Sequence, residues 1–104
     1  MKIAIAVTSS GKDAHVDTHG ARASYYLILK TDSGSSEILP NPVTQAERRA
    51  GPQAAAFLVS QGVDKVVAGD FGLKFRTELE GRNITCTEMA GSAMEVIAEL
   101  SDQM

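Results

Sequence analysis

The stretch PQAAAFLVSQGVDKVVAG, residues 52–69, decides the fold, because a helix pattern runs directly into a strand pattern there. Pro52 suits a first helical turn, where the N–H that proline lacks would have no partner within the helix. One helix face is formed by Ala54, Phe57, Leu58 and Gln61. Gly62 is a natural stop, and residues 63–69 form an apolar run that suits a buried strand. We therefore expect the second half of a strand–helix–strand unit, whose right-handed crossover joins parallel strands.

The strand that precedes this unit is expected at the N-terminus. Residues 2–8, KIAIAVT, are apolar on both faces, as in a central strand that is covered on both sides. Residues 24–31 and the shorter run 37–40 flank a Gly/Ser turn. These two runs predict an antiparallel β-hairpin.

The remaining elements are a helix, a strand and a closing helix, at residues 71–81, 83–89 and 91–100. In the first of these helices, Phe75 and Leu79 meet four residues apart. In the closing helix, Ser92 and Glu95 have the spacing of a capping box. The order β, β-hairpin, α, β, α, β, α predicts an α/β fold, with a mixed sheet of about five strands and helices packed over it.

Composition narrows the class of protein. A chain of 104 residues fits one domain, residues 1–104, and 43% hydrophobic with 22% charged residues is typical of a soluble globular protein. The net charge of −3 does not show the excess of Lys and Arg on which nucleic-acid binding depends. Cys86 stands alone, so no disulfide forms within the chain, which suits a reducing cytoplasm. We expect a cytoplasmic protein with neither a nucleic-acid nor a membrane partner.

The side chains that can carry chemistry concentrate in DAHVDTHGAR, residues 13–22, here called the histidine loop. His15 and His19 have helical spacing, but β-branched residues and a glycine disfavour a helix in this segment. The loop follows the first strand, at the edge where ligands gather in open α/β sheets. We expect one crevice to collect the histidine loop, Ser9, Ser10 and residues 70–74. The alternative of two exposed loop histidines stays open, because spacing fixes no third ligand.

Motifs of catalysis are weak in this chain. Gly11 and Lys12 follow a strand as in a phosphate-binding loop, but Ala6 and Asp13 stand where that motif needs glycine and Ser/Thr. Neither a Ser-His-Asp nor a Cys-His arrangement is evident from spacing, and Cys86 is expected to be a small buried apolar residue. We therefore expect no enzyme. Hydrolysis of nucleic acid by loop carboxylates is a minor alternative.

Three longer stretches carry a resemblance: residues 1–7 (MKIAIAV), 16–29 (VDTHGARASYYLIL) and 50–72 (AGPQAAAFLVSQGVDKVVAGDFG). They resemble the dinitrogenase iron–molybdenum cofactor biosynthesis family over about residues 1–100. The resemblance implies a ribonuclease H-like, three-layer α/β/α fold, with a five-stranded mixed sheet, an antiparallel second strand and about three helices. It also implies non-covalent binding of an iron–sulfur or molybdenum–iron–sulfur cluster, or of its precursor, which is held or delivered rather than turned over.

The same resemblance points to the histidine loop as the binding site. The usual family motif is His-Phe-Gly-Arg-Ala. This chain matches it at His19 and Arg22-Ala23, and has Gly20 and Ala21 in place of Phe and Gly. An anionic sulfide cluster needs cationic or N–H donors and one or two soft or imidazole ligands. The expected binding residues are His15, His19, Arg22, Lys74, Ser10, Gly11 and Gly72, with His19 as the metal ligand.

Partners follow from the implied role. The expected partner is a protein that assembles the cluster or one that accepts it. Arg48 and Arg49, which precede Gly51-Pro52, would add local positive charge. Because the His-Phe-Gly text is altered, a metal-free interaction or regulatory domain of the same fold is the alternative. Neither the identity of the cluster nor the oligomeric state follows from the sequence.

Overall fold

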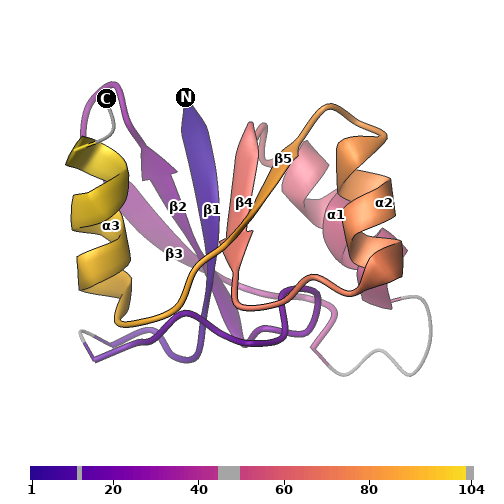
Figure 1. The fold of residues 1–104 in the computed structure, drawn as a ribbon, viewed down its shortest axis with the longest axis horizontal. Coiled ribbons are helices and arrows are strands. Elements are labelled where there is room, and N and C mark those ends of the chain that lie inside the picture. The colour runs from indigo at the N-terminus through magenta and orange to yellow at the C-terminus, as the bar shows by residue number, and fades with distance from the viewer. Residues whose placement is uncertain (12, 45–49, 103–104) are drawn as a thin grey trace.

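Five strands form a mixed sheet in the order β3-β2-β1-β4-β5 in the computed structural model, which describes residues 1–11, 13–44 and 50–102 (Figure 1). The elements are β1 (Lys2–Val7), β2 (Tyr25–Lys30), β3 (Ser36–Pro40), α1 (Ala50–Ser60), β4 (Lys65–Ala68), α2 (Leu73–Glu80), β5 (Thr85–Glu88) and α3 (Ala93–Asp102). This order confirms the element order that the sequence predicts. The helix α1 begins two residues before Pro52, at Ala50.

The central strand β1 pairs antiparallel with β2 and parallel with β4, so that Ile5 lies between Leu27 and Val67. Strand β2 also pairs antiparallel with β3, which confirms the hairpin and the antiparallel second strand. The strand order reverses at β1, because the chain leaves it first toward β2 and later crosses over to β4. The carboxyl ends of β1 and β4 therefore meet at one edge of the sheet.

The helices cover both faces of the sheet, as Figure 1 shows. Helices α1 and α2 lie together on one face, where Tyr26, Leu58 and Phe75 belong to one core cluster. Helix α3 lies on the other face, where Val96 and Leu100 belong to a second cluster. The structure is thus the three-layer α/β/α arrangement.

The alternation in β1 explains how one strand serves both layers. Its alanines, Ala4 and Ala6, face α1 and α2, whereas Ile3, Ile5 and Val7 face α3. Small side chains leave room beneath two helices, and the larger ones fill the layer that a single helix covers. In the described residues, no helix is long and apolar enough to cross a membrane.

Candidate functional site

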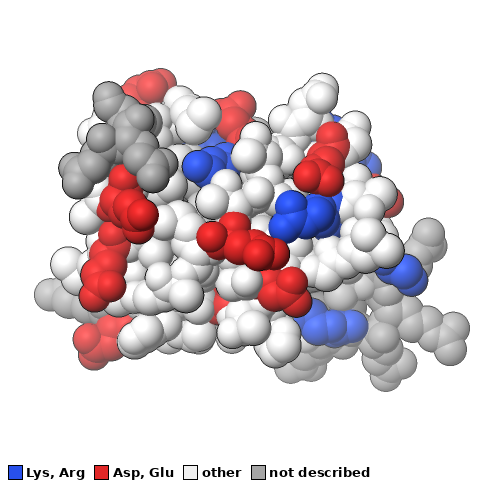
Figure 2. Space-filling model, in the orientation of Figure 1, with Lys and Arg blue, Asp and Glu red and all other residues white. Residues whose placement is uncertain are grey.

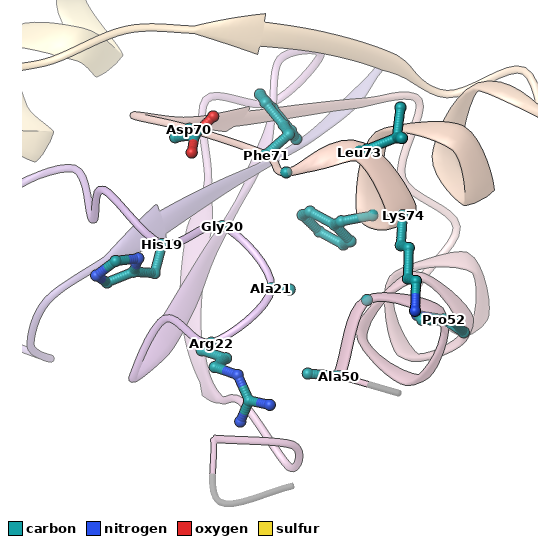
Figure 3. A pocket seen from close by; sticks show the side chains of 13 residues that line it. His19, Gly20, Ala21, Arg22, Ala50, Pro52, Asp70, Phe71, Leu73 and Lys74 are labelled. Atoms are coloured by element: carbon teal, nitrogen blue, oxygen red, sulfur yellow. The ribbon is translucent and has the colours of Figure 1, made fainter. Parts of the chain in front are cut away.

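A pocket of about 470 Å³ opens where β4 leads into α2 (Figure 3). Three segments that are distant in sequence line it: the end of the histidine loop, the start of α1, and the turn into α2. The lining residues are His19, Gly20, Ala21, Arg22, Ala50, Gly51, Pro52, Asp70, Phe71, Gly72, Leu73, Lys74 and Phe75. The pocket therefore lies at the sheet edge where the sequence predicts a crevice.

Backbone hydrogen bonds hold the histidine loop across this edge. The N–H of Asp17 donates to the carbonyl of Ala6 at the end of β1, and the N–H of Gly69 donates to the carbonyl of Asp17 at 2.9 Å. His19 forms a parallel β-bridge with Asp70, and the N–H of Gly20 donates to the Asp70 carbonyl at 3.0 Å. The loop is thus an extended segment rather than a helix, which confirms that prediction.

The floor of the pocket is aromatic and packed. Phe71 is 4% exposed and Phe75 is 2% exposed, and their rings stack with centroids 5.7 Å apart. The guanidinium of Arg76 lies 5.1 Å from the centroid of Phe71 and also contacts Glu88 at 3.2 Å. This packing fixes the turn from which α2 begins.

Cationic side chains stand around the pocket. Arg22 and Lys74 are exposed, and Figure 3 shows the Lys74 side chain extending toward the start of α1. His19 is also exposed, but its imidazole points away from Lys74 and from α2 in that view. Among the described lining residues, Asp70 is the one acid.

The N-terminus of α2 adds to this positive character. Gly72 precedes the helix with φ +70°, a conformation that glycine adopts readily, and no side chain within the described residues caps it. The uncapped N–H groups of the first turn carry the positive end of the helix dipole. In that turn, the side chain of Lys74 adds positive charge at the pocket, whereas Arg76 is paired with Glu80 and Glu88.

The face drawn in Figure 2 shows how charge is divided. Many Asp and Glu side chains gather over α3, whereas Lys and Arg side chains reach the end of the molecule where α1 and α2 begin. The pocket lies at this second end, although the chain as a whole carries a net charge of −3. The local charge therefore favours an anionic ligand despite the overall acidity.

The structure brings four of the predicted binding residues to the pocket: His19, Arg22, Gly72 and Lys74. Ser10, Gly11 and His15 do not line it. Arg48 and Arg49 lie outside the residues that the structure describes.

His15 is separated from the pocket because the first half of the histidine loop belongs to the α3 side. Ala14 and Val16 are buried in the core beneath α3, and His15 forms a bridge with Ser92 just before that helix. Gly11 is bonded to the same part of the loop, because its carbonyl accepts a hydrogen bond from the N–H of Ala14. The loop crosses from one face of the sheet to the other between His15 and His19.

The described residues do not form a complete ligand shell for a metal ion. Within residues 1–11, 13–44 and 50–102, no group of three or more His, Cys, Asp or Glu side chains could hold a metal ion. Cys86 lies on β5, only half-buried, and is not among the residues that line the pocket. The arrangement can hold an anion through charge and N–H donors, with His19 as the nearest imidazole.

Two residues that support the pocket, Tyr26 and Asn41, could not be predicted from the sequence. The buried hydroxyl of Tyr26 donates to the carbonyl of Gly20, and the Asn41 amide donates to the carbonyls of Ala21 and Ala23, both at 2.9 Å. A buried tyrosine needs a partner for its hydroxyl, which is a general signal but does not name the partner. Asn41 follows a strand in a polar stretch, and nothing in its sequence context marks it as buried.

Comparisons with known proteins agree on the fold. The model of the family described as dinitrogenase iron-molybdenum cofactor matches residues 1–103. The solved structure of a NifB-like protein of the DUF35 family from Thermotoga is 27% identical, with a TM-score of 0.82 over 97% of this chain and 87% of that one. No curated protein matches the chain significantly.

Two further solved structures share the fold at lower identity. The apo form of the orange protein from Desulfovibrio gigas is 22% identical, with a TM-score of 0.89 over 98% of this chain and 88% of that one. A dinitrogenase-like protein from Methanocaldococcus jannaschii is 14% identical, with a TM-score of 0.72 over 99% of this chain and 89% of that one.

Proposed function

Because the chain belongs to the dinitrogenase iron-molybdenum cofactor family, we propose that its pocket holds an anionic metal–sulfur species during metallocofactor assembly. The cargo is an iron–sulfur or molybdenum–iron–sulfur cluster, or a precursor of one. It is bound and passed on rather than converted, so the protein acts as a carrier and not as an enzyme.

One observation carries this proposal: Arg22, Lys74 and the uncapped start of α2 line the same pocket. The planar guanidinium of Arg22 can donate two parallel hydrogen bonds to sulfide or oxo atoms, whereas Lys74 supplies a more localised charge. The helix N-terminus adds N–H donors that favour negative charge. All three therefore favour the same kind of ligand.

The manner of binding follows from the donor set. Since the described residues offer no group of three metal ligands, charge and hydrogen bonds would supply most of the affinity. His19 is the candidate for a direct bond to the metal. Its imidazole points away from Lys74 in Figure 3, so ligation inside the pocket requires a change of its side-chain rotamer.

Such a site suits a carrier. A cluster that many protein ligands hold is released slowly, whereas one that is held mainly by charge can leave when an acceptor supplies better ligands. The packed rings of Phe71 and Phe75 form the floor of the pocket and reduce the access of water to bound sulfide. The expected partners are proteins that assemble or accept the cluster.

Binding of tetrathiomolybdate, a simple molybdenum–sulfur anion, tests the proposal. We expect the parent protein to bind it with a change in visible absorbance, and Arg22→Gln and Lys74→Gln each to weaken binding by about five- to tenfold. Lys30→Gln is the matched control, because Lys30 is exposed at the other end of β2. Equal affinity in the parent, the two pocket variants and the control would remove the pocket from the proposal.

A metal-free interaction domain is the second candidate. The lack of three grouped metal ligands among the described residues favours it. Metal and sulfide analysis of protein purified without oxygen separates the two candidates. Stoichiometric metal with sulfide supports the carrier, whereas metal-free protein that also fails anaerobic reconstitution with iron, sulfide and molybdate supports the interaction domain.

A further inference from the structure

Gly51 stands near the start of α1, where a glycine weakens the helix. Among the described glycines, positive φ values occur at Gly34, Gly62, Gly72 and Gly91, and not at Gly51. Its backbone conformation is thus open to any residue. Alanine is the better helix former, because glycine loses more conformational freedom when a helix forms. The reason for a glycine at this position must therefore lie in the packing around it.

Gly51 packs on the backbone of α2. A Cβ atom at position 51 would stand 3.0 Å from the backbone nitrogen of Phe75, 3.3 Å from its Cα and 3.4 Å from the carbonyl carbon of Lys74. Because these three distances are similar, the Cβ would lie over the face of the peptide that joins Lys74 to Phe75. The neighbour is backbone, which cannot swing aside as the end of a flexible side chain can. A methyl group at position 51 must therefore move the first turn of α2 relative to α1 by a few tenths of an ångström.

The first turn of α2 is held from its other side as well. The ring of Phe75 lies against Gly20 of the histidine loop, which has no room for a Cβ atom. The same ring is 2% exposed and stacks on Phe71. Phe75 thus lies between two glycines, with its ring on Gly20 and its backbone on Gly51, and both glycines line the pocket. A shift of α2 at Gly51 would consequently disturb a second close contact.

Lys74 is the side chain whose position depends on this contact. Its carbonyl carbon belongs to the peptide that Gly51 covers, and its exposed side chain lines the pocket. Figure 3 shows this side chain extending toward the start of α1. Among the residues that the structure describes, no acid forms an ion pair with its amino group. The packing of its backbone is therefore what fixes the place from which its charge reaches out.

We propose that Gly51 is a positioning residue of the pocket: it admits the backbone of α2 to close contact and so sets the place from which Lys74 reaches an anionic cargo. The inference rests on the proposed function and deepens it, because it names a residue that acts on the cargo through Lys74. A wider spacing of the two helices would displace the ammonium group relative to the histidine loop. Charge attraction and hydrogen bonding both weaken with such a displacement.

Equilibrium binding of tetrathiomolybdate to Gly51→Ala tests the inference. We expect this variant to bind about three- to tenfold more weakly than the parent, since the methyl group shifts the start of α2. The cost of the substitution should fall below about twofold in the Lys74→Gln background, because the position of residue 74 no longer matters once its charge is gone. A change that merely loosened the fold would cost the same in both backgrounds.

Ala56→Gly is the matched control, because it makes the reverse exchange at an exposed position of α1 that does not line the pocket. It should lower the urea midpoint of unfolding by about 0.5–1 M through lost helix propensity, and should leave the affinity unchanged. An equal loss of affinity in Ala56→Gly and Gly51→Ala would overturn the inference, because binding would then follow the stability of α1.

The remaining outcomes separate the inference from the proposed function. If Lys74→Gln binds more weakly than the parent but Gly51→Ala binds equally well, the inference is overturned and the proposed function stands. An equal cost of Gly51→Ala in the two backgrounds has the same meaning. If the parent does not bind the anion, or if Lys74→Gln binds as tightly as the parent, both are overturned. A Gly51→Ala protein that does not fold also overturns the inference, because the contact would then support the whole fold and not the position of Lys74.

Discussion

Gly20 lies directly against the ring of Phe75. A Cβ atom at position 20 would stand 3.0 Å from Cε2 of Phe75 and 3.0 Å from the carbonyl oxygen of Asp70. The close contact between the histidine loop and the turn into α2 therefore depends on the absence of a side chain at this position. The phenylalanine of the usual family motif would not fit at position 20, because Phe75 of α2 fills the space beside it.

Substitution Gly20→Ala should consequently lower the free energy of unfolding by about 1–3 kcal/mol, because the new methyl group must push the loop or the Phe75 ring aside. Urea denaturation measures the change. Gly11→Ala is the control, since a Cβ there would have Ser9 Oγ at 3.9 Å as its nearest neighbour. Equal losses in the two variants would show that the Gly20 contact is not tight in solution.

The fold could be predicted from the sequence because its signals are local. The alternation of alanine with Ile and Val in β1 marks a strand covered on both faces, and the Phe75–Leu79 pair marks the buried face of α2. At α3, the Ser92 hydroxyl accepts the N–H of Glu95 at 3.1 Å, which confirms that half of the expected capping box. Each of these signals spans only a few residues.

The site could be predicted only in part. His19, Arg22 and Lys74 reach one pocket because they stand near the ends of β1 and β4, which the strand order brings together. His15 does not, since the chain crosses the sheet edge between the two histidines. That crossing depends on hydrogen bonds between distant residues, such as Asp17 with Gly69, and residue spacing does not encode them.

Tyr26 should make the stability of the protein fall at alkaline pH. Burial first, and then the charge of Asp17, raise the pKa of Tyr26 well above its ordinary value. Its pKa in the folded state is thus higher than in the unfolded state, so its contribution is complete below about pH 10 and is lost as the pH rises further. In Tyr26→Phe, the decline of unfolding free energy above that pH should be shallower by up to about 1.4 kcal/mol per pH unit.

Urea denaturation of the parent and Tyr26→Phe at a series of pH values from about 8 to about 11.5 measures the two slopes. Tyr25 is half-buried and is retained in the variant, so it is common to both series of measurements. Parallel curves over the alkaline range would mean that the Tyr26 hydroxyl ionises as easily in the folded state as in the unfolded chain.

Salt should weaken the binding of an anionic cargo. Arg22 and Lys74 are both exposed, so their attraction for a ligand is screened as ionic strength rises. We expect the affinity for tetrathiomolybdate to fall several-fold between about 50 mM and about 500 mM sodium chloride. Arg22→Gln and Lys74→Gln should each flatten this dependence, whereas Lys30→Gln should keep the slope of the parent. An affinity that is independent of salt would assign binding to ligation or apolar contact instead of charge.

Cys86 should react slowly and should not be needed for binding. Partial burial raises the pKa of its thiol and Glu80 raises it further, while Arg76 opposes them and lowers it. Since the thiolate is the reactive form, iodoacetamide at neutral pH should modify Cys86 roughly three- to tenfold more slowly than free cysteine. Glu80→Gln should speed the reaction and Arg76→Gln should slow it, as mass spectrometry of timed samples would measure.

Because Cys86 does not line the pocket, alkylated protein should bind tetrathiomolybdate as tightly as the parent. Loss of binding on alkylation would make the thiol a ligand and would move the cargo toward β5.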